Sequence, residues 1–178
     1  MTLDVVEIDR ETARAFIDAF HPMKTRGALR GCAIALGGFE EHGLSFVALF
    51  VHPRSRWTRV PVTLELSRLA ISPNARRSAA TFLRKVARVL KRRGFRGFIV
   101  TYALPGTSGA VYIRAGWTPF GLSSGARRSR RGPNGRPTPD TVGSGIRLAR
   151  FILQIGSGSP PAPPRRPSPQ ADGHRPAE

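Results

Sequence analysis

The chain has 178 residues, which favours one domain with a sizeable buried core. Lys and Arg outnumber Asp and Glu by 29 to 11, which gives a net charge of +18. No apolar run reaches the length of a membrane span, and the acidic N-terminus lacks a signal-peptide pattern. The single cysteine, Cys32, excludes an internal disulfide, so the composition predicts a protein of the reducing cytoplasm.

The excess of positive charge indicates which partners the protein can bind, and it does not indicate the fold. Nucleic acid is the leading partner, because neutralisation of phosphates dominates non-specific binding. An anionic cofactor or an acidic membrane surface can use the same charge. In the alternative explanation the charge serves no partner: a high-GC genome favours Arg codons over Lys codons, and the arginines lie on a solvated surface.

The N-terminal third predicts a strand, a helix and a hairpin. Residues 3–8 form the strand, and Asp9 can cap a helix over about residues 10–20. Pro22 disfavours helix in the residue before it and ends this element. The inner face of the helix is expected to carry Ala13, Phe16, Ile17 and Phe20. Apolar strands follow at 31–38 and 44–51, joined by a Gly-rich turn.

The centre of the chain predicts a strand, a long basic helix and a second strand. In the first strand, residues 62–71, alternation gives two faces. One face carries Leu64, Leu66, Arg68 and Ala70, and the other carries Thr63, Glu65, Ser67, Leu69 and Ile71. Ser72 and Pro73 suit a helix start, and Gly94 ends a helix that runs to about residue 93. A strand at 97–102 should then lie parallel to the first through a right-handed crossover.

The C-terminal third changes in composition. A short helix and a strand lead to Gly121, and residues 123–141 read as a mobile basic loop. A last strand covers 146–155, and the Pro-rich residues 156–178 are expected to be disordered. The whole order predicts an α/β domain over residues 1–155, with a mixed sheet flanked by helices on both faces.

This order of elements resembles the GNAT acyltransferase fold, whose mainly antiparallel mixed sheet splays between its fourth and fifth strands. The resemblance implies acetyl-CoA or a related acyl donor in that gap, with its pyrophosphate at the start of the following helix. The usual Arg/Gln-x-x-Gly-x-Gly/Ala signature is absent, and no glycine lies between Ser72 and Arg93. The cofactor contacts implied by the resemblance are Leu69, Ala70, Ile71, Asn74, Arg76, Arg77, Ser78 and Ser108. Asn74, Ser78 and Ser108 can instead be helix caps.

Three local motifs resemble a narrower family, the GNAT-like Mom enzymes that modify bacteriophage DNA. They are Glu65-Leu-Ser-Arg-Leu69, the segment from Asn74 to Leu83, and Val100-Thr-Tyr102 leading into Gly109-x-x-Tyr112-x-x-x-x-Trp117. A histidine after the first helix, here His21, also fits that family. The resemblance covers about residues 21–121. It implies transfer of a carbamoylmethyl group to the exocyclic amine of adenine in phage DNA, inside the host cytoplasm, which blocks restriction enzymes.

Glu65, Tyr112 and His21 are the candidate catalytic residues. Glu65 can take the proton of a reacting amine, or it can be a structural partner of an arginine. Tyr112 follows a Gly-containing loop where many GNAT enzymes place a general acid, although its ring can also simply pack on the sheet. His21 can act as a base or a metal ligand, or be an ordinary loop residue beside proline. The four histidines and one cysteine show no zinc spacing.

The candidate contacts to double-stranded DNA are Arg54, Arg56, Trp57, Arg59, Arg68, Arg127, Arg128, Arg130 and Arg131. Arginines with an interleaved aromatic can hold a strand and stack on a displaced base, and adenine must leave the duplex stack to react. Arg68 sits among apolar neighbours, so it is expected to clamp a phosphate or to form an internal ion pair with Glu65 or Asp18.

The leading hypothesis is therefore a GNAT-like transferase that modifies adenine in DNA. The alternatives are an acyl-CoA-dependent N-acetyltransferase acting on a protein or small-molecule amine, and a non-catalytic DNA-binding protein on a transferase scaffold.

Overall fold

The computed structural model describes residues 2–25, 29, 31–53, 62–103, 107, 109–122 and 148–156. The predicted basic loop at 123–141 and the predicted tail beyond residue 156 lie outside these residues. So does most of the arginine-rich loop between residues 52 and 61.

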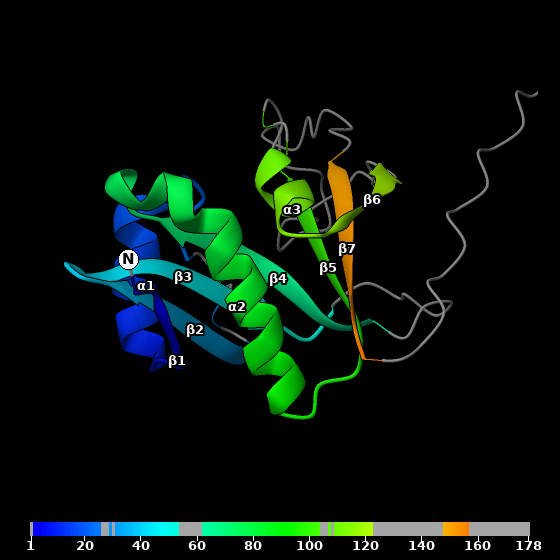
Figure 1. Cartoon of the computed structure of the whole chain (residues 1–178), viewed down its shortest axis with the longest axis horizontal. Coiled ribbons are helices and arrows are strands. Elements are labelled where there is room, and N and C mark those ends of the chain that lie inside the picture. Colours follow the sequence, from blue (N-terminus) through cyan, green and yellow to red (C-terminus); the bar gives the residue numbers. More distant parts are fainter. Residues whose placement is uncertain are drawn as a thin grey trace, which may run out of the picture.

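A seven-stranded sheet in the order β1-β2-β3-β4-β5-β7-β6 forms the centre of the described fold (Figure 1). Only β4 and β5 are parallel neighbours, and every other neighbouring pair is antiparallel. The elements are β1 (Asp4–Glu7), α1 (Arg10–Phe20), β2 (Cys32–Glu40), β3 (Gly43–Val51), β4 (Val62–Ile71), the 3-10 helix η1 (Pro73–Ser78), α2 (Ala79–Arg92), β5 (Gly97–Ala103), α3 (Ala110–Arg114), β6 (Thr118–Leu122) and β7 (Ala149–Ile155). The predicted mixed sheet with its parallel central pair is confirmed.

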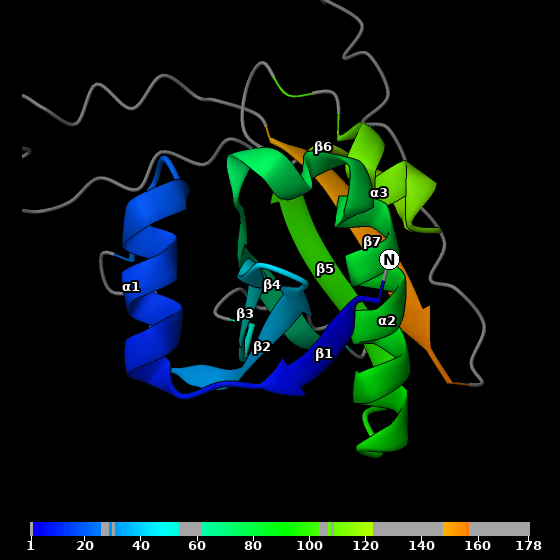
Figure 2. The same ribbon diagram turned by 60° about the vertical axis from the view of Figure 1, so that its left-hand side comes forward.

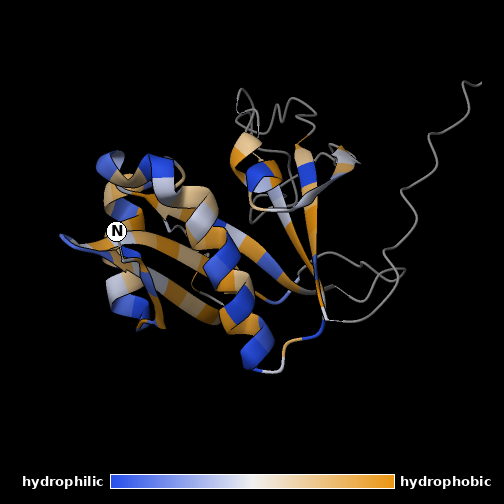
Figure 3. Cartoon of the chain, in the orientation of Figure 1, coloured by the Kyte–Doolittle hydropathy of each residue, from blue (hydrophilic) through white to orange (hydrophobic). Residues whose placement is uncertain are grey.

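The sheet buries one hydrophobic cluster on each face, and α1 and α2 lie on opposite faces (Figure 2). On the α1 face, Ala13, Phe16 and Ile17 pack against side chains of β2, β3 and β4. On the α2 face, Phe82 stacks on Phe46 with ring centroids 4.8 Å apart, within the larger cluster. The outward side of α2 is hydrophilic (Figure 3). The predicted helices on both faces are therefore confirmed.

Helix α1 begins and ends largely as the sequence predicts. Asp9 Oδ1 accepts a hydrogen bond from the Thr12 N–H at 2.8 Å, which satisfies one orphan donor of the first turn. Phe20, which is predicted on the inner face of the helix, remains 44% exposed. It packs against Phe16 at the end of the helix and lines the cavity described below instead.

The segment after β4 differs from the single helix that the sequence predicts. Residues Pro73–Ser78 form η1, and α2 begins only at Ala79. The Ser72 side chain makes no capping hydrogen bond, whereas its backbone N–H donates to the Ser45 carbonyl at 2.9 Å. The helix ends beside Gly94, which has a φ of 84° and thus needs glycine's freedom in the left-handed region.

A β-bulge at Ser67 overturns the predicted alternation in β4. Leu66 pairs with Phe50 and Arg68 pairs with Leu49, so Ser67 is the extra residue. Before the bulge, Leu64 and Leu66 belong to the cluster under α2. After it, Leu69 and Ile71 pack on that cluster, while Arg68 and Ala70 lie on the α1 side. One inserted residue has changed which face every later side chain takes.

Candidate active site

The parallel pair β4–β5 stays paired over only part of its length. The register ends where Leu66 lies opposite Thr101, although β4 continues to Ile71. The Thr101 hydroxyl donates to the Leu66 carbonyl at 3.0 Å, at this last point of contact. Beyond it, β4 pairs with β3 alone among the described strands. The backbone of residues 67–71 therefore presents one edge without a neighbouring strand.

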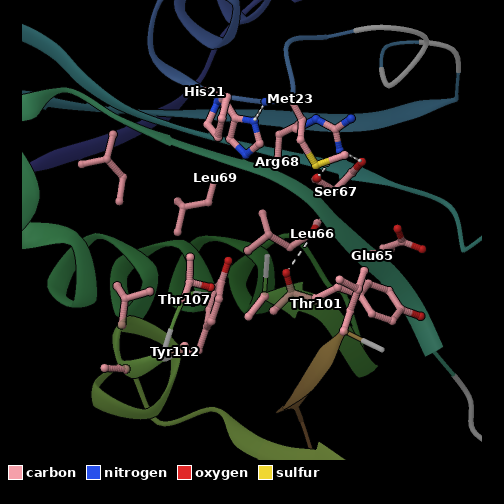
Figure 4. Close-up of a pocket in the computed structure, with 18 of the residues that line it drawn as sticks. His21, Met23, Glu65, Leu66, Ser67, Arg68, Leu69, Thr101, Thr107 and Tyr112 are labelled. Carbon is pink, nitrogen blue, oxygen red and sulfur yellow. Dashed lines mark hydrogen bonds between the residues drawn. The ribbon is translucent and has the colours of Figure 1, made fainter. Parts of the chain in front are cut away.

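A cavity of about 620 Å³ occupies the resulting gap. It is lined by β4, β5, α3 and the segment that follows α1 (Figure 4). Its volume falls in the range of small-molecule and cofactor sites. The predicted site residues that line it are His21, Glu65, Arg68, Leu69, Ile71, Arg76 and Tyr112.

Other predicted contacts lie elsewhere. Ala70 is buried in the cluster under α1, so its side chain does not line the cavity. Asn74, Arg77 and Ser78 belong to η1 and are not among the lining residues either. The predicted contacts outside the described residues are Ser108, Arg54, Arg56, Trp57, Arg59, Arg127, Arg128, Arg130 and Arg131.

Tyr112 occupies the α2 side of the cavity on the short helix α3. The centroid of its ring lies 5.2 Å from that of the Phe151 ring and 5.6 Å from that of the Trp117 ring. Gly109 starts α3 with a φ of 64°, and any Cβ at that position would collide with the Phe151 ring. Burial raises the pKa of the Tyr112 hydroxyl, and a hydrogen bond with Thr101 partly opposes that rise. The hydroxyl therefore carries its proton at neutral pH.

His21 lies at the C-terminal end of α1, on the other side of the cavity. Its Nδ1 accepts a hydrogen bond from the Met23 backbone N–H at 3.1 Å. Burial chiefly, and the charge of Arg68 in addition, lower the pKa of the imidazole to about 4. The ring is therefore neutral at pH 7, and its proton lies on Nε2 because Nδ1 is an acceptor. His21 is thus a hydrogen-bond donor toward the cavity, and its Nδ1 lone pair is already engaged.

Arg68 lies beside His21, just after the β-bulge. Its Nε donates to the Lys24 carbonyl at 3.1 Å, and its Nη1 donates to the Ser67 carbonyl at 2.7 Å. The predicted ion pair with Asp18 is wrong, because Asp18 Oδ1 accepts from the Thr25 N–H and hydroxyl, each at 2.8 Å. Burial lowers the pKa of Arg68, and the charge of Glu65 opposes this.

Sequence reasoning missed Lys24, Met23 and Thr101. The first two position Arg68 and His21 through backbone groups, which no residue pattern reports. Lys24 also has a φ of 44°, an uncommon conformation for a non-glycine residue. Thr101 is 1% exposed on an otherwise apolar strand, and that isolated polar residue was the available clue. No group of His, Cys, Asp and Glu that could hold a metal occurs within the described residues.

The chain matches no protein-family model and no curated protein sequence. Solved structures resemble it in fold. An IAA acetyltransferase from Bacillus cereus is 13% identical over 86% of this chain and all of its own, with a TM-score of 0.60. The ribosomal-protein-S18-alanine N-acetyltransferase of Escherichia coli is 12% identical over 89% of this chain and 97% of its own, with a TM-score of 0.56.

A Bacillus subtilis acetyltransferase, solved in complex with CoA, is 12% identical. It covers 86% of this chain and 97% of its own, with a TM-score of 0.55. Together these structures show that the chain has the GNAT fold, as its order of elements predicts. None of the described helices is both long and apolar enough to cross a membrane.

Proposed function

We propose that the protein transfers an acyl group from an acyl-CoA thioester to an amine. The observation that carries this proposal is the edge of β4 along residues 67–71, which pairs with no other described strand and borders the cavity. The flexible arm of CoA contains amide groups, and an exposed strand edge binds such a chain through backbone hydrogen bonds. The similar structure that contains CoA supports the same choice of donor.

The phosphate end of CoA needs positive charge, and η1 supplies it. Arg76 lines the cavity, and Arg77 is the next residue of the same helix. Both are exposed, and neither forms a salt bridge with another described residue. We expect arginine side chains to take the role that a glycine-rich turn plays through its backbone N–H groups.

Acyl transfer to an amine releases one proton from nitrogen and requires one at the departing sulfur. When bound, an acyl thioester supplies the activated carbonyl carbon and the thiolate leaving group. Tyr112 holds a proton at its buried hydroxyl and is the proposed general acid. Glu65 lines the same cavity from β4 and is the proposed base for the amine. His21 takes neither role in this scheme, because its imidazole is neutral and Nδ1 is engaged.

Release of free CoA thiol from acetyl-CoA, measured with a panel of amines and amino acids, tests this function. The wild-type protein should bind CoA in a calorimetric titration and release thiol only when an acceptor is present. Absence of both CoA binding and thiol release, from protein shown to be folded by circular dichroism, would contradict the proposal.

A second candidate places the acceptor amine on adenine in double-stranded DNA, with transfer of a carbamoylmethyl group. The supporting observation is the segment from residue 66 to residue 139, which contains no Asp or Glu and sixteen Lys and Arg residues. Among its exposed members on η1 and α2, Arg77, Arg84, Arg88 and Lys91 recur at steps of three, four or seven residues. A surface of this kind favours phosphate backbones over neutral partners.

Mass spectrometry of nucleosides separates the two acceptors. Plasmid DNA from bacteria that express the protein is compared with DNA from bacteria that express Tyr112→Phe. A modified deoxyadenosine that is lost in the variant would establish the DNA reaction and give the mass of the group. Unmodified DNA together with acetyl-CoA turnover would favour a protein or small-molecule amine.

A further inference from the structure

Two hydrogen-bond donors meet on the α1 side of the cavity. His21 and Arg68 lie on one side of β4, whereas Tyr112 and Thr107 lie on the other (Figure 4). All four line the same space. The β-bulge at Ser67 produces this division, because it sends Arg68 to the α1 side while Leu69 packs on the α2 side.

The local hydrogen bonds leave one donor group available on each side chain. His21 uses Nδ1 to accept from Met23, which leaves Nε2–H. Arg68 uses Nε and Nη1 for the Lys24 and Ser67 carbonyls, and Nη2 makes no hydrogen bond to any described residue. Both side chains are therefore held in place by the bonds already made, and each retains a donor for a ligand.

The chemistry of this pair suits an oxyanion. Neither group can accept a hydrogen bond, and Arg68 brings a positive charge that is half-buried. A half-buried guanidinium gains most from an anionic partner, and Asp18 is engaged by Thr25 and Arg14 instead. Arg76 adds a second positive charge to the lining of the same cavity. Glu65 also lines the cavity and its charge acts on Arg68, so a bound oxyanion would be the second negative charge beside these two positive ones.

We propose that His21 Nε2 and Arg68 Nη2 form a subsite for a carboxylate or phosphate carried by the acceptor beside its reacting amine. This inference rests on the proposed acyl transfer, because Tyr112 and η1 then assign the opposite side of the cavity to the acyl donor. An α-amino acid and a nucleotide both carry such an oxyanion. His21 and Arg68 position the acceptor and do not exchange protons with it.

Matched pairs of acceptors test the subsite. One arm compares an amino acid with the amine obtained by its decarboxylation, and the other compares 2′-deoxyadenosine 5′-monophosphate with 2′-deoxyadenosine. In one arm or the other, the anionic member should have a kcat/KM higher by about 10- to 100-fold, as expected for charge-assisted hydrogen bonds. The arm that shows the preference identifies the source of the oxyanion.

Variants connect the preference to the two side chains. Arg68→Gln should abolish this preference, chiefly by raising KM for the anionic acceptor, because the charge that pairs with the oxyanion is lost. Arg68→Lys should restore part of it, and His21→Phe should reduce it. Arg92→Gln, the same change at an exposed position of α2, is the control and should keep the full preference.

The inference and the proposed function fail in different ways. If amines are acylated with no preference for either anionic member, or if Arg68→Gln keeps the preference, the subsite is wrong and acyl transfer stands. If no acceptor is turned over, calorimetric titration with acetate and inorganic phosphate still tests the subsite. Binding that is lost in Arg68→Gln and kept in Arg92→Gln would support it, and equal or absent binding in all three proteins would contradict it.

Discussion

The two halves of β4 show how one strand serves both stability and the candidate site. Up to Leu66 the strand pairs with β5, and Glu65 and Leu66 pair with β3 on the other edge as well; Leu64 is 0% exposed in the core. From Ser67 onward only the β3 edge is paired, and Arg68, Leu69 and Ile71 line the cavity. A strand that is paired on both edges cannot bind a ligand through its backbone. The unpaired half gives up sheet hydrogen bonds and gains a binding edge.

Removal of the same side-chain atoms from each half of β4 should have unequal effects on stability. Leu64→Ala should lower the free energy of unfolding by about 2–5 kcal/mol, because it leaves a cavity in the core. Leu69→Ala should lower it by about 1 kcal/mol, because Leu69 is only partly buried. Urea denaturation measures both values. Equal losses would contradict the division of β4 into a structural and a functional half.

Tyr112→Phe should impair catalysis far more than stability. The loss of the proposed acid should lower kcat for acyl transfer by about 10²-fold, near the lower end for general acid catalysis. The fold should tolerate the change, with a loss of about 1 kcal/mol for the hydrogen bond with Thr101. Thiol release and urea denaturation measure the two effects. Tyr102→Phe is the matched variant at the other tyrosine, and an equal fall in its kcat would contradict the assignment.

Gly109→Ala tests whether close packing behind Tyr112 holds it in place. The new Cβ meets the Phe151 ring, so the variant should lose about 1–3 kcal/mol of stability from overpacking, in addition to backbone strain. Gly116→Ala is the control. Gly116 also has a positive φ, 89°, but a Cβ there meets nothing within 4 Å. The thermal midpoint should therefore fall further in the first variant, and equal falls would mean that backbone strain alone matters.

A pH titration of stability gives the smallest expected effect. The pKa of His21 in the folded protein, about 4, lies below its unfolded value of 6.5, so the unfolded state binds more protons between these values. Stability should thus fall as the pH drops below about 6.5. The imidazole is only partly buried, so solvent screening reduces the effect. The free energy of unfolding should fall by about 1 kcal/mol more in wild type than in His21→Gln between pH 7 and pH 5. If the urea midpoints of wild type and His21→Gln shift by the same amount between pH 7 and pH 5, the neutral, half-buried imidazole is contradicted.

Local signals in the sequence predicted most of the elements. Asp9 as the cap of α1, Gly94 as the end of α2 and the parallel β4–β5 pair are all confirmed, because each depends on neighbouring residues or on a short crossover. The bulge at Ser67 could not be predicted from alternation. It depends on pairing with β3, whose register is set elsewhere in the chain.

The sequence indicates candidate site residues, but it does not indicate the hydrogen bonds that they make. His21, Arg68 and Tyr112 were all singled out, yet the hydrogen bonds that determine their chemical roles come from the backbone of Met23, Lys24 and Ser67. From sequence alone His21 can be a base, a metal ligand or an ordinary loop residue, and its surroundings make it a neutral hydrogen-bond donor. Phe20 is predicted on the inner face of α1 from its apolar spacing. It is nevertheless 44% exposed, because α1 borders the cavity at this position.

Hydrogen–deuterium exchange of the backbone, with and without CoA, tests whether the open edge of β4 binds the acyl donor. If the open edge of β4 binds the acyl donor, CoA should slow exchange of the amides in residues 67–71. Amides in residues 62–66 are already paired or adjacent to β5 and should change little. Exchange that is unaltered by saturating CoA along residues 67–71, or slowed only elsewhere, would contradict the account.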